Sequence, residues 1–101
     1  MRVEGEFFQS QLEHQRWMEL KLLERAGAIE GLRRQTPFEL IVGSVRIGRY
    51  TADATYVENG EFVIEDAKGQ LTKEYKRTRL LVCALYGIRI REVTQKGRRG
   101  R

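Results

Sequence analysis

Two aspartates and a lysine have the types and spacing to support catalysis. Asp66 and Lys68 lie two positions apart in an apparent strand, so their side chains share one face of a sheet. Asn59-Gly60 predicts a tight hairpin turn, and a hairpin closed there places Asp53 directly opposite Asp66. Opposed side chains lie about 4.5–5.5 Å apart, where like charges repel. Such a pair is a poor structural solution but a good cation site.

The alternative is that both aspartates lie on a solvated face. Phe62 and Ile64 share the face of Asp66, which indicates that most of that face looks inward. Val63 and Ala67 supply apolar groups to the other face. A sheet covered on both sides and polar only at one strand end is typical of ligand sites in α/β proteins, so we favour a site. Hard oxygen donors without a cysteine or histidine cluster indicate Mg²⁺ or Mn²⁺ rather than zinc.

Glu13 is the candidate for a third carboxylate. Ser10 and Glu13 match a capping box, in which the glutamate would bond back to the first residues of a helix. At about 100° per residue, however, Glu13 falls between Trp17 and Leu20 inside the apolar arc of that helix, and would point toward the sheet. The pattern leaves both interpretations of Glu13 open.

The elements that must position these residues follow from periodicity, caps and turns. A helix is expected from Ser10 to Ala26, ended by a glycine, and a second from Thr72 to Tyr86. Strands are expected over residues 37–42, over the second half of 45–57, and over 61–68 and 88–93. The order is therefore α-β-β-β-α-β, a mixed sheet flanked by two helices. The last two strands should be parallel, because a helix connects them.

Composition predicts one folded domain over residues 1–95, in a chain of 101 residues with a net charge of +5. Residues 1–67 hold 8 basic and 12 acidic residues, whereas residues 68–101 hold 11 and 2. A basic second half, ending in a flexible tail over 96–101, indicates a polyanionic partner such as nucleic acid. A merely solubilising surface is the alternative. A single cysteine and the lack of a secretory signal or membrane span suggest an intracellular, cytoplasmic setting.

Four further residues have simpler explanations. His14 is turned about 100° away from Glu13, so an exposed side chain is expected rather than a catalytic base. Cys83 is expected to be a small core residue. Trp17 is expected to pack, while Tyr75 lies among basic residues and could stack on a base.

Three segments together resemble a known superfamily. They are "FFQSQLEHQRWMELKLLERAGAIEGLRRQTPFEL", "YTADATYV" and "VIEDAKGQLTKEYKRTRLL", and they cover nearly the whole chain. With the predicted element order, Asp53 and Asp66-Ala67-Lys68 resemble the PD-(D/E)XK, or restriction-endonuclease-like, superfamily. The likeness is greatest to small phage-encoded nucleases related to Holliday junction resolvases. The sequence departs from the motif in having Ala52 where proline is usual and Asp66 where glutamate is commoner.

The resemblance implies roles for these residues. Asp53, Asp66 and the Ala67 carbonyl would bind catalytic Mg²⁺, for which Mn²⁺ can substitute. Glu13 matches a glutamate of the resolvase-like branch, and Lys68 would orient the attacking water. A homodimer acting on branched DNA in a bacterial host is implied. Flanking phosphates would meet basic residues of the second helix and the tail: Lys73, Lys76, Arg77, Arg79, Lys96, Arg98, Arg99 and Arg101.

The sequence therefore predicts a metal-dependent DNA endonuclease, selective for DNA structure rather than sequence. Two alternatives remain open. One is a nuclease-fold protein that binds DNA and cuts nothing, and the other is an interaction module without a nucleic acid partner.

Overall fold

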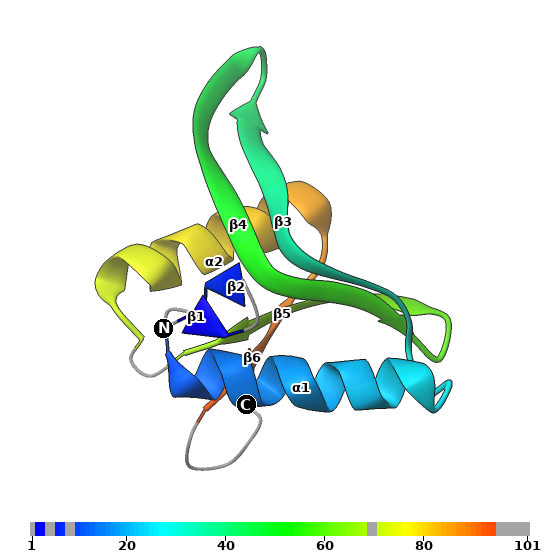
Figure 1. The fold of residues 1–101 in the computed structure, drawn as a ribbon. Helices are drawn as coiled ribbons and strands as arrows, with labels where there is room; N and C mark the ends of the chain where they lie inside the picture. Colours follow the sequence, from blue (N-terminus) through cyan, green and yellow to red (C-terminus); the bar gives the residue numbers. More distant parts are fainter. Residues whose placement is uncertain (1, 4–5, 8–9, 69–70, 95–101) are drawn as a thin grey trace.

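The computed structural model describes residues 2–3, 6–7, 10–68 and 71–94. Its helices and strands follow the predicted order α-β-β-β-α-β, preceded by two very short strands (Figure 1). The elements are β1 (Arg2–Val3), β2 (Glu6–Phe7), α1 (Gln11–Arg25), β3 (Glu30–Val42), β4 (Val45–Glu58), β5 (Glu61–Ala67), α2 (Lys73–Tyr86) and β6 (Ile90–Val93).

Both helices begin and end where their capping residues predict. The Ser10 hydroxyl accepts a hydrogen bond from the Glu13 amide, and the Thr72 hydroxyl accepts one from the Tyr75 amide. Gly87 closes α2 in the left-handed conformation, with a φ of 69°, and its amide donates to the carbonyl of the last turn. These local signals set the helix positions independently of the tertiary fold.

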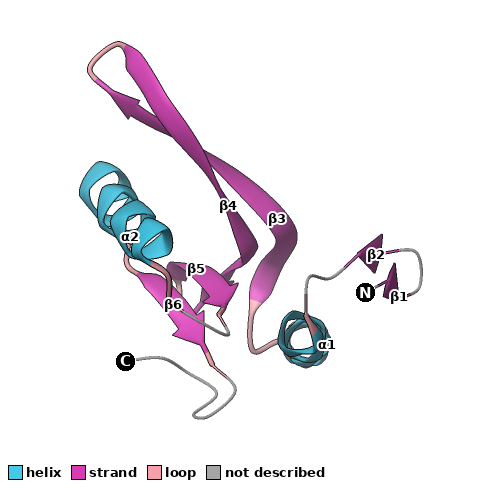
Figure 2. Cartoon of the chain, turned by 90° about the vertical axis from the view of Figure 1, so that its left-hand side faces the viewer, coloured by secondary structure: helices cyan, strands magenta, loops and turns pink. Residues whose placement is uncertain are grey.

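One four-stranded sheet forms the centre of the molecule, with strand order β3-β4-β5-β6. The first three strands run antiparallel, and β5 pairs with β6 in parallel across the α2 connection. Figure 2 shows α1 and α2 on opposite sides of this sheet. The mixed α/β fold expected from the sequence is therefore confirmed.

Each helix covers its own core. On the α1 side, Leu20 packs with Ala54, Tyr56 and Val63. On the α2 side, a larger core holds residues from every long strand and from the helix: Leu40, Tyr50, Ala52, Ile64, Tyr75, Val82 and Ile90. The sheet therefore lies between two packed cores, which hold the middle of β4 and the end of β5 in place.

Four expectations about this body were wrong. The strand predicted to start at residue 37 starts at Glu30, and the next strand includes all of 45–58. The first half of β3 was missed because Leu32 is followed by polar inward residues, Arg34 and Thr36, which break the apolar alternation. Phe62 lies on the expected face but near the hairpin end, and it is exposed. Cys83 is exposed as well, because it lies on the outer side of α2.

The β3–β4 ribbon bends sharply at one point (Figure 1). On β3, Gln35 adopts a φ of 56° and stands between the residues that pair with Ala52 and Ala54. Strand alternation would place Ala52 and Ala54 on one face, yet they pack in the cores on opposite sides. The kink, formed by Gln35 and the facing Asp53, thus reverses which residues look inward. Beyond it, residues 36–52 form an arm that projects from the body.

Candidate active site

The hairpin register is the one predicted from its turn. Glu58 pairs with Glu61, and the ladder continues to Ala54 opposite Glu65. At the next position, the Asp53 amide donates to Asp66 Oδ1 at 2.9 Å, and the Ala67 amide donates to Asp53 Oδ2 at 2.9 Å. Each aspartate side chain therefore bonds to the backbone of the opposite strand. The predicted juxtaposition of Asp53 and Asp66 is present where the kink of β4 meets the end of β5.

The two carboxylates do not project from one face as expected. Asp53 lines a small cavity under α1, together with Ala67. Asp66 lies on the other side, where its Oδ2 accepts a hydrogen bond from Tyr50. The kink explains the difference, because it turns the side chain of Asp53 toward α1 while its amide still meets Asp66. The acids approach each other around the strand end rather than across a flat ladder.

Asp66 is completely buried, with a relative exposure of 0%. Burial raises the pKa of its carboxyl group, and the Tyr50 hydroxyl and the Lys68 ammonium partly oppose that rise. The same burial, with the nearby Asp66 charge, raises the pKa of Tyr50. Tyr50 was not recognised from the sequence. Tyr50 lies on the arm side of the kink. Because the kink reverses which residues of β4 face α2, simple strand alternation does not predict that Tyr50 contacts Asp66.

Burial also raises the pKa of Asp53 to about 7, and repulsion from Asp66 adds to the rise. Glu13 adds further repulsion, whereas the Ala67 amide and Lys68 act in the opposite direction. The charges of the other two acids and of the lysine therefore all act on the Asp53 carboxyl group. A hydrogen bond between Asp53 and Asp66, the Lys68–Asp66 ion pair and the cavity shared by Glu13 and Asp53 bring the four predicted catalytic residues into one neighbourhood.

The Glu13 side chain points toward the sheet. Its amide bonds to Ser10 as in a capping box, but its carboxylate accepts from Gln35 at 3.1 Å and from Arg34 at 3.4 Å. Glu13 is 6% exposed and lines the same cavity as Asp53. The inward orientation expected of Glu13 is therefore present, together with the Ser10 half of the capping box, and its role as a metal ligand stays a prediction. Arg34 and Gln35, whose polarity kept early β3 from being predicted as a strand, hold the Glu13 carboxylate.

Lys68 is held above the α2 side of the site by two neighbours. Its ammonium lies 3.8 Å from Asp66 Oδ2 and 4.4 Å from the centre of the Tyr75 ring. The Tyr75 hydroxyl donates to Glu92 on β6 at 2.9 Å, and Glu92 also accepts from Arg79 at 2.7 Å. Tyr75 is buried and so is not placed to stack on a base. It instead forms one wall around Lys68.

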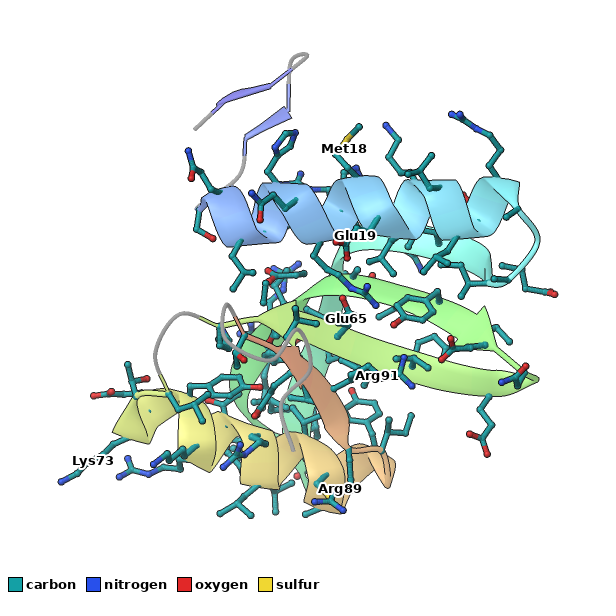
Figure 3. All side chains as sticks on the ribbon, turned by 90° about the horizontal axis from the view of Figure 1, so that it is seen from below. Met18, Glu19, Glu65, Lys73, Arg89 and Arg91 are labelled. Carbon is teal, nitrogen blue, oxygen red and sulfur yellow. The ribbon has the colours of Figure 1, made fainter. Side chains whose placement is uncertain are left out.

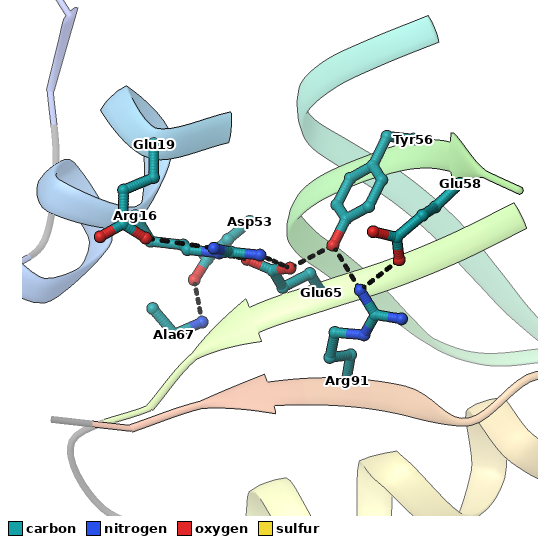
Figure 4. A network of polar contacts seen from close by, with 8 residues as sticks. All are labelled: Arg16, Glu19, Asp53, Tyr56, Glu58, Glu65, Ala67 and Arg91. Atoms are coloured by element: carbon teal, nitrogen blue, oxygen red, sulfur yellow. Dashed lines mark hydrogen bonds and ion pairs between the residues drawn. The ribbon is translucent and has the colours of Figure 1, made fainter. Parts of the chain in front are cut away.

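A buried charge network lies behind the site (Figure 4). Arg16 on α1 donates to both oxygens of Glu65 on β5, at 2.7 and 3.1 Å. Glu65 also accepts from Tyr56, whose hydroxyl accepts from Arg91 on β6. Arg16 lies one turn after Glu13, and Glu65 is adjacent to Asp66. The network therefore fixes α1 against the strand that carries the site.

The predicted phosphate contacts lie on or beyond α2. Lys73, Lys76 and Arg77 are exposed, and Lys73 points away from the body at the start of the helix (Figure 3). Arg79 is half-buried through its ion pair with Glu92. The predicted contacts of the tail fall outside the described residues: Lys96, Arg98, Arg99 and Arg101.

Within the described ranges, no three His, Cys, Asp or Glu side chains already surround one point at metal-ligand spacing. Glu13, Asp53 and Asp66 are neighbours, and each is held by protein hydrogen-bond donors. A metal centre at these residues therefore remains a prediction.

Comparison with known proteins gives a family but no activity. The family model described as "Protein of unknown function (DUF1064)" matches residues 1–96. The chain belongs to this family. No curated protein and no solved structure matches it. In the part of the chain that the structure describes, no helix is both long and apolar enough to cross a membrane.

Proposed function

We propose that this protein is a metal-dependent DNA endonuclease that acts on branched DNA. The observation that carries the proposal is the meeting of Asp53, at the kink within β4, with Asp66 and Lys68 at the end of β5. The acids bond to each other's strands, and the lysine lies beside them. An acid pair with an adjacent ammonium at a strand end is the arrangement that the resemblance to PD-(D/E)XK nucleases implies.

The donor set fits a divalent cation. Burial raises the pKa of both carboxyl groups, and repulsion from Asp66 adds to the rise at Asp53. A cation bound to both would remove that repulsion, and carboxylate and carbonyl oxygens are the ligands that Mg²⁺ and Mn²⁺ prefer. Asp53, Asp66, Glu13 and the Ala67 carbonyl would hold it. When bound, the metal would acidify a water molecule and neutralise charge on the phosphate.

The protein's own residues would prepare the reacting groups. Tyr50 and the Asp53 amide hold both oxygens of Asp66, which fixes the orientation of that carboxylate. Lys68 carries a compact positive charge that can orient the attacking water and stabilise charge on the phosphate. The Tyr75 ring restricts where the Lys68 ammonium can lie. Such prior positioning lowers the cost of assembling the transition state.

Exposed cations on α2 would hold the DNA flanking the cut. Lys73, Lys76 and Arg77 lie five to nine residues after Lys68, on the side of the sheet where Lys68 lies. Contacts to phosphates position the duplex without reading its sequence. Selection by the shape of the DNA therefore agrees better with this surface than a base-specific code does.

A protein of this fold that binds DNA without cutting it is the second candidate. It would need the basic helix but not the acid pair. The presence of one fully buried and one half-buried acid beside a lysine disfavours it, since such a pair costs stability when no cation is bound.

The test is a cleavage panel with the full chain. Single-stranded, duplex, flap and four-way substrates are incubated with Mg²⁺, with Mn²⁺ and with a chelator. We expect metal-dependent cleavage of at least one branched substrate and none by Asp66→Asn. Binding of all substrates without cleavage under any metal condition would favour the silent binding protein.

A further inference from the structure

The cavity under α1 is lined by a polar group that the described chain does not satisfy. Trp17 lies one helical turn after Glu13, and both side chains line the cavity together with Asp53. The indole Nε1 of Trp17 is buried, and within the described residues it has no hydrogen-bond partner. A buried N–H without an acceptor costs free energy, so such groups in native proteins are almost always bonded to protein or to ordered water.

The size of the cavity restricts what can meet this N–H group. A volume of about 10 Å³ is open to the centre of a water molecule, and one bound water needs roughly 10–15 Å³ on that measure. A phosphate group or an organic ligand is too large for this space. A metal ion has no lone pair and therefore cannot accept a hydrogen bond from an indole. The oxygen of a single water molecule is the acceptor that fits.

Asp53 is the acid best able to accept a hydrogen bond from such a water. Glu65 also lines the cavity, but it already accepts hydrogen bonds at both of its oxygens. Asp53 accepts from the Ala67 amide, and a carboxylate offers about four acceptor positions. A water between Trp17 and Asp53 would satisfy a buried donor and solvate a half-buried carboxylate at the same time. Glu13, which lines the same cavity, can accept its second proton.

We propose that this cavity binds one ordered water molecule, which accepts a hydrogen bond from the Trp17 indole and donates to the Asp53 carboxylate. The Trp17 ring packs against the α1-side core, so the water has a fixed position. Trp17 is then a positioning residue of the cation site, a role that rests on the proposed function. Because protein-bound Mg²⁺ usually keeps several waters, a water held beside Asp53 would complete the ligand shell of the cation rather than compete with it.

Nuclear magnetic resonance tests the water itself, in the full chain without metal or DNA. Trp17 is the only tryptophan, so its indole N–H gives a single signal. We expect an Overhauser effect between this proton and water, with the sign of a long-lived contact and not of proton exchange. An indole proton that contacts no water would overturn the proposal.

The Mg²⁺ affinity of Trp17→Phe tests the positioning role, because phenylalanine keeps an aromatic ring in the core but lacks the N–H donor. We expect the Mg²⁺ dissociation constant, measured by isothermal titration calorimetry without DNA, to rise about tenfold. Leu23→Ala is the matched control, since Leu23 packs from α1 against the same core but is not among the residues that line the cavity. It should lower the free energy of unfolding and leave the dissociation constant unchanged.

Two results would contradict the positioning role. An unchanged dissociation constant in Trp17→Phe would do so, and an equal rise in both variants would show that Trp17 acts only through packing. A wild-type protein that binds Mg²⁺ without a water at the indole proton overturns this inference alone. One that shows the water but binds no Mg²⁺ overturns the cation site of the proposed function, and with it the positioning role of Trp17.

Discussion

Replacing Asp53 by asparagine should stabilise the metal-free protein at alkaline pH. The substitution removes a charge that repels Asp66 while keeping an oxygen that can accept from the Ala67 amide. A carboxyl group whose pKa is raised by folding binds more protons in the folded state than in the unfolded state. Its stabilising effect is complete below the unfolded pKa of about 4 and is lost as the pH rises through the folded pKa. For Asp53 that window extends from about pH 4 to about pH 7.

The size of the effect follows from the shift. Asp53 moves from 3.8 to about 7, and each pKa unit corresponds to about 1.4 kcal/mol. Solvent reaches part of this half-buried group, which reduces the change expected in the free energy of unfolding to about 2–4 kcal/mol. Asp66 shifts in the same direction, so the wild-type protein should lose stability between pH 4 and 8 in the absence of metal. Asp53→Asn should lose less.

Urea unfolding at a series of pH values, with a chelator or with Mg²⁺, provides the measurement. Mg²⁺ should restore the stability of the wild-type protein at pH 8, because the cation binds only to the folded site. It should have little effect on Asp53→Asn, because that variant lacks one of the proposed carboxylate ligands. Glu30→Gln is the control, since Glu30 is an exposed acid on β3 outside the site. A wild-type protein equally stable at pH 5 and pH 8 in chelator would refute the reasoning, as would equal stabilisation of both proteins by Mg²⁺.

Three further predictions concern the residues around the site. Tyr75→Leu should reduce the rate of DNA cleavage by about tenfold or more with DNA affinity unchanged. Tyr75→Phe keeps the ring beside Lys68 and should retain most of the activity. Equal losses of rate for the two variants in single-turnover assays would argue against a role for the ring. Arg16→Met removes two hydrogen bonds from buried Glu65 and should lower the free energy of unfolding by about 3 kcal/mol in urea denaturation. Adding Glu65→Gln should restore part of this loss. An unchanged urea midpoint would show that the network does not stabilise the fold. Lys76→Gln and Arg77→Gln should each weaken DNA binding and reduce the slope of log affinity against log salt by about 1 in fluorescence anisotropy titrations, and an unaltered slope would place the DNA elsewhere.

The sequence was sufficient where local signals decide the structure. Helix caps, the Asn59-Gly60 turn and strand alternation predicted the element order and the hairpin register, because each depends on residues close in the chain. From the register alone, Asp53 and Asp66 could be placed beside each other. Their hydrogen bonds confirm that they meet.

What the sequence did not predict depends on the kink. The left-handed conformation of Gln35 has no local sequence signal, since glycine would be the usual residue there. It reverses the faces of both strands, which separated the side chains of Asp53 and Asp66 and brought Tyr50 to the site. Early β3 was missed for a related reason: Arg34 faces inward to meet Glu13, and a strand with polar inward positions lacks the expected pattern.

The most direct test of the central claim compares site variants in single-turnover cleavage of a branched DNA substrate. We expect Asp53→Asn, Asp66→Asn and Lys68→Met each to lose about 10²–10³-fold or more in rate while still binding the DNA, and Glu30→Gln, purified in the same way, to cut like the wild-type protein. Cleavage that persists in all three site variants, or a wild-type protein that never cuts, would contradict it.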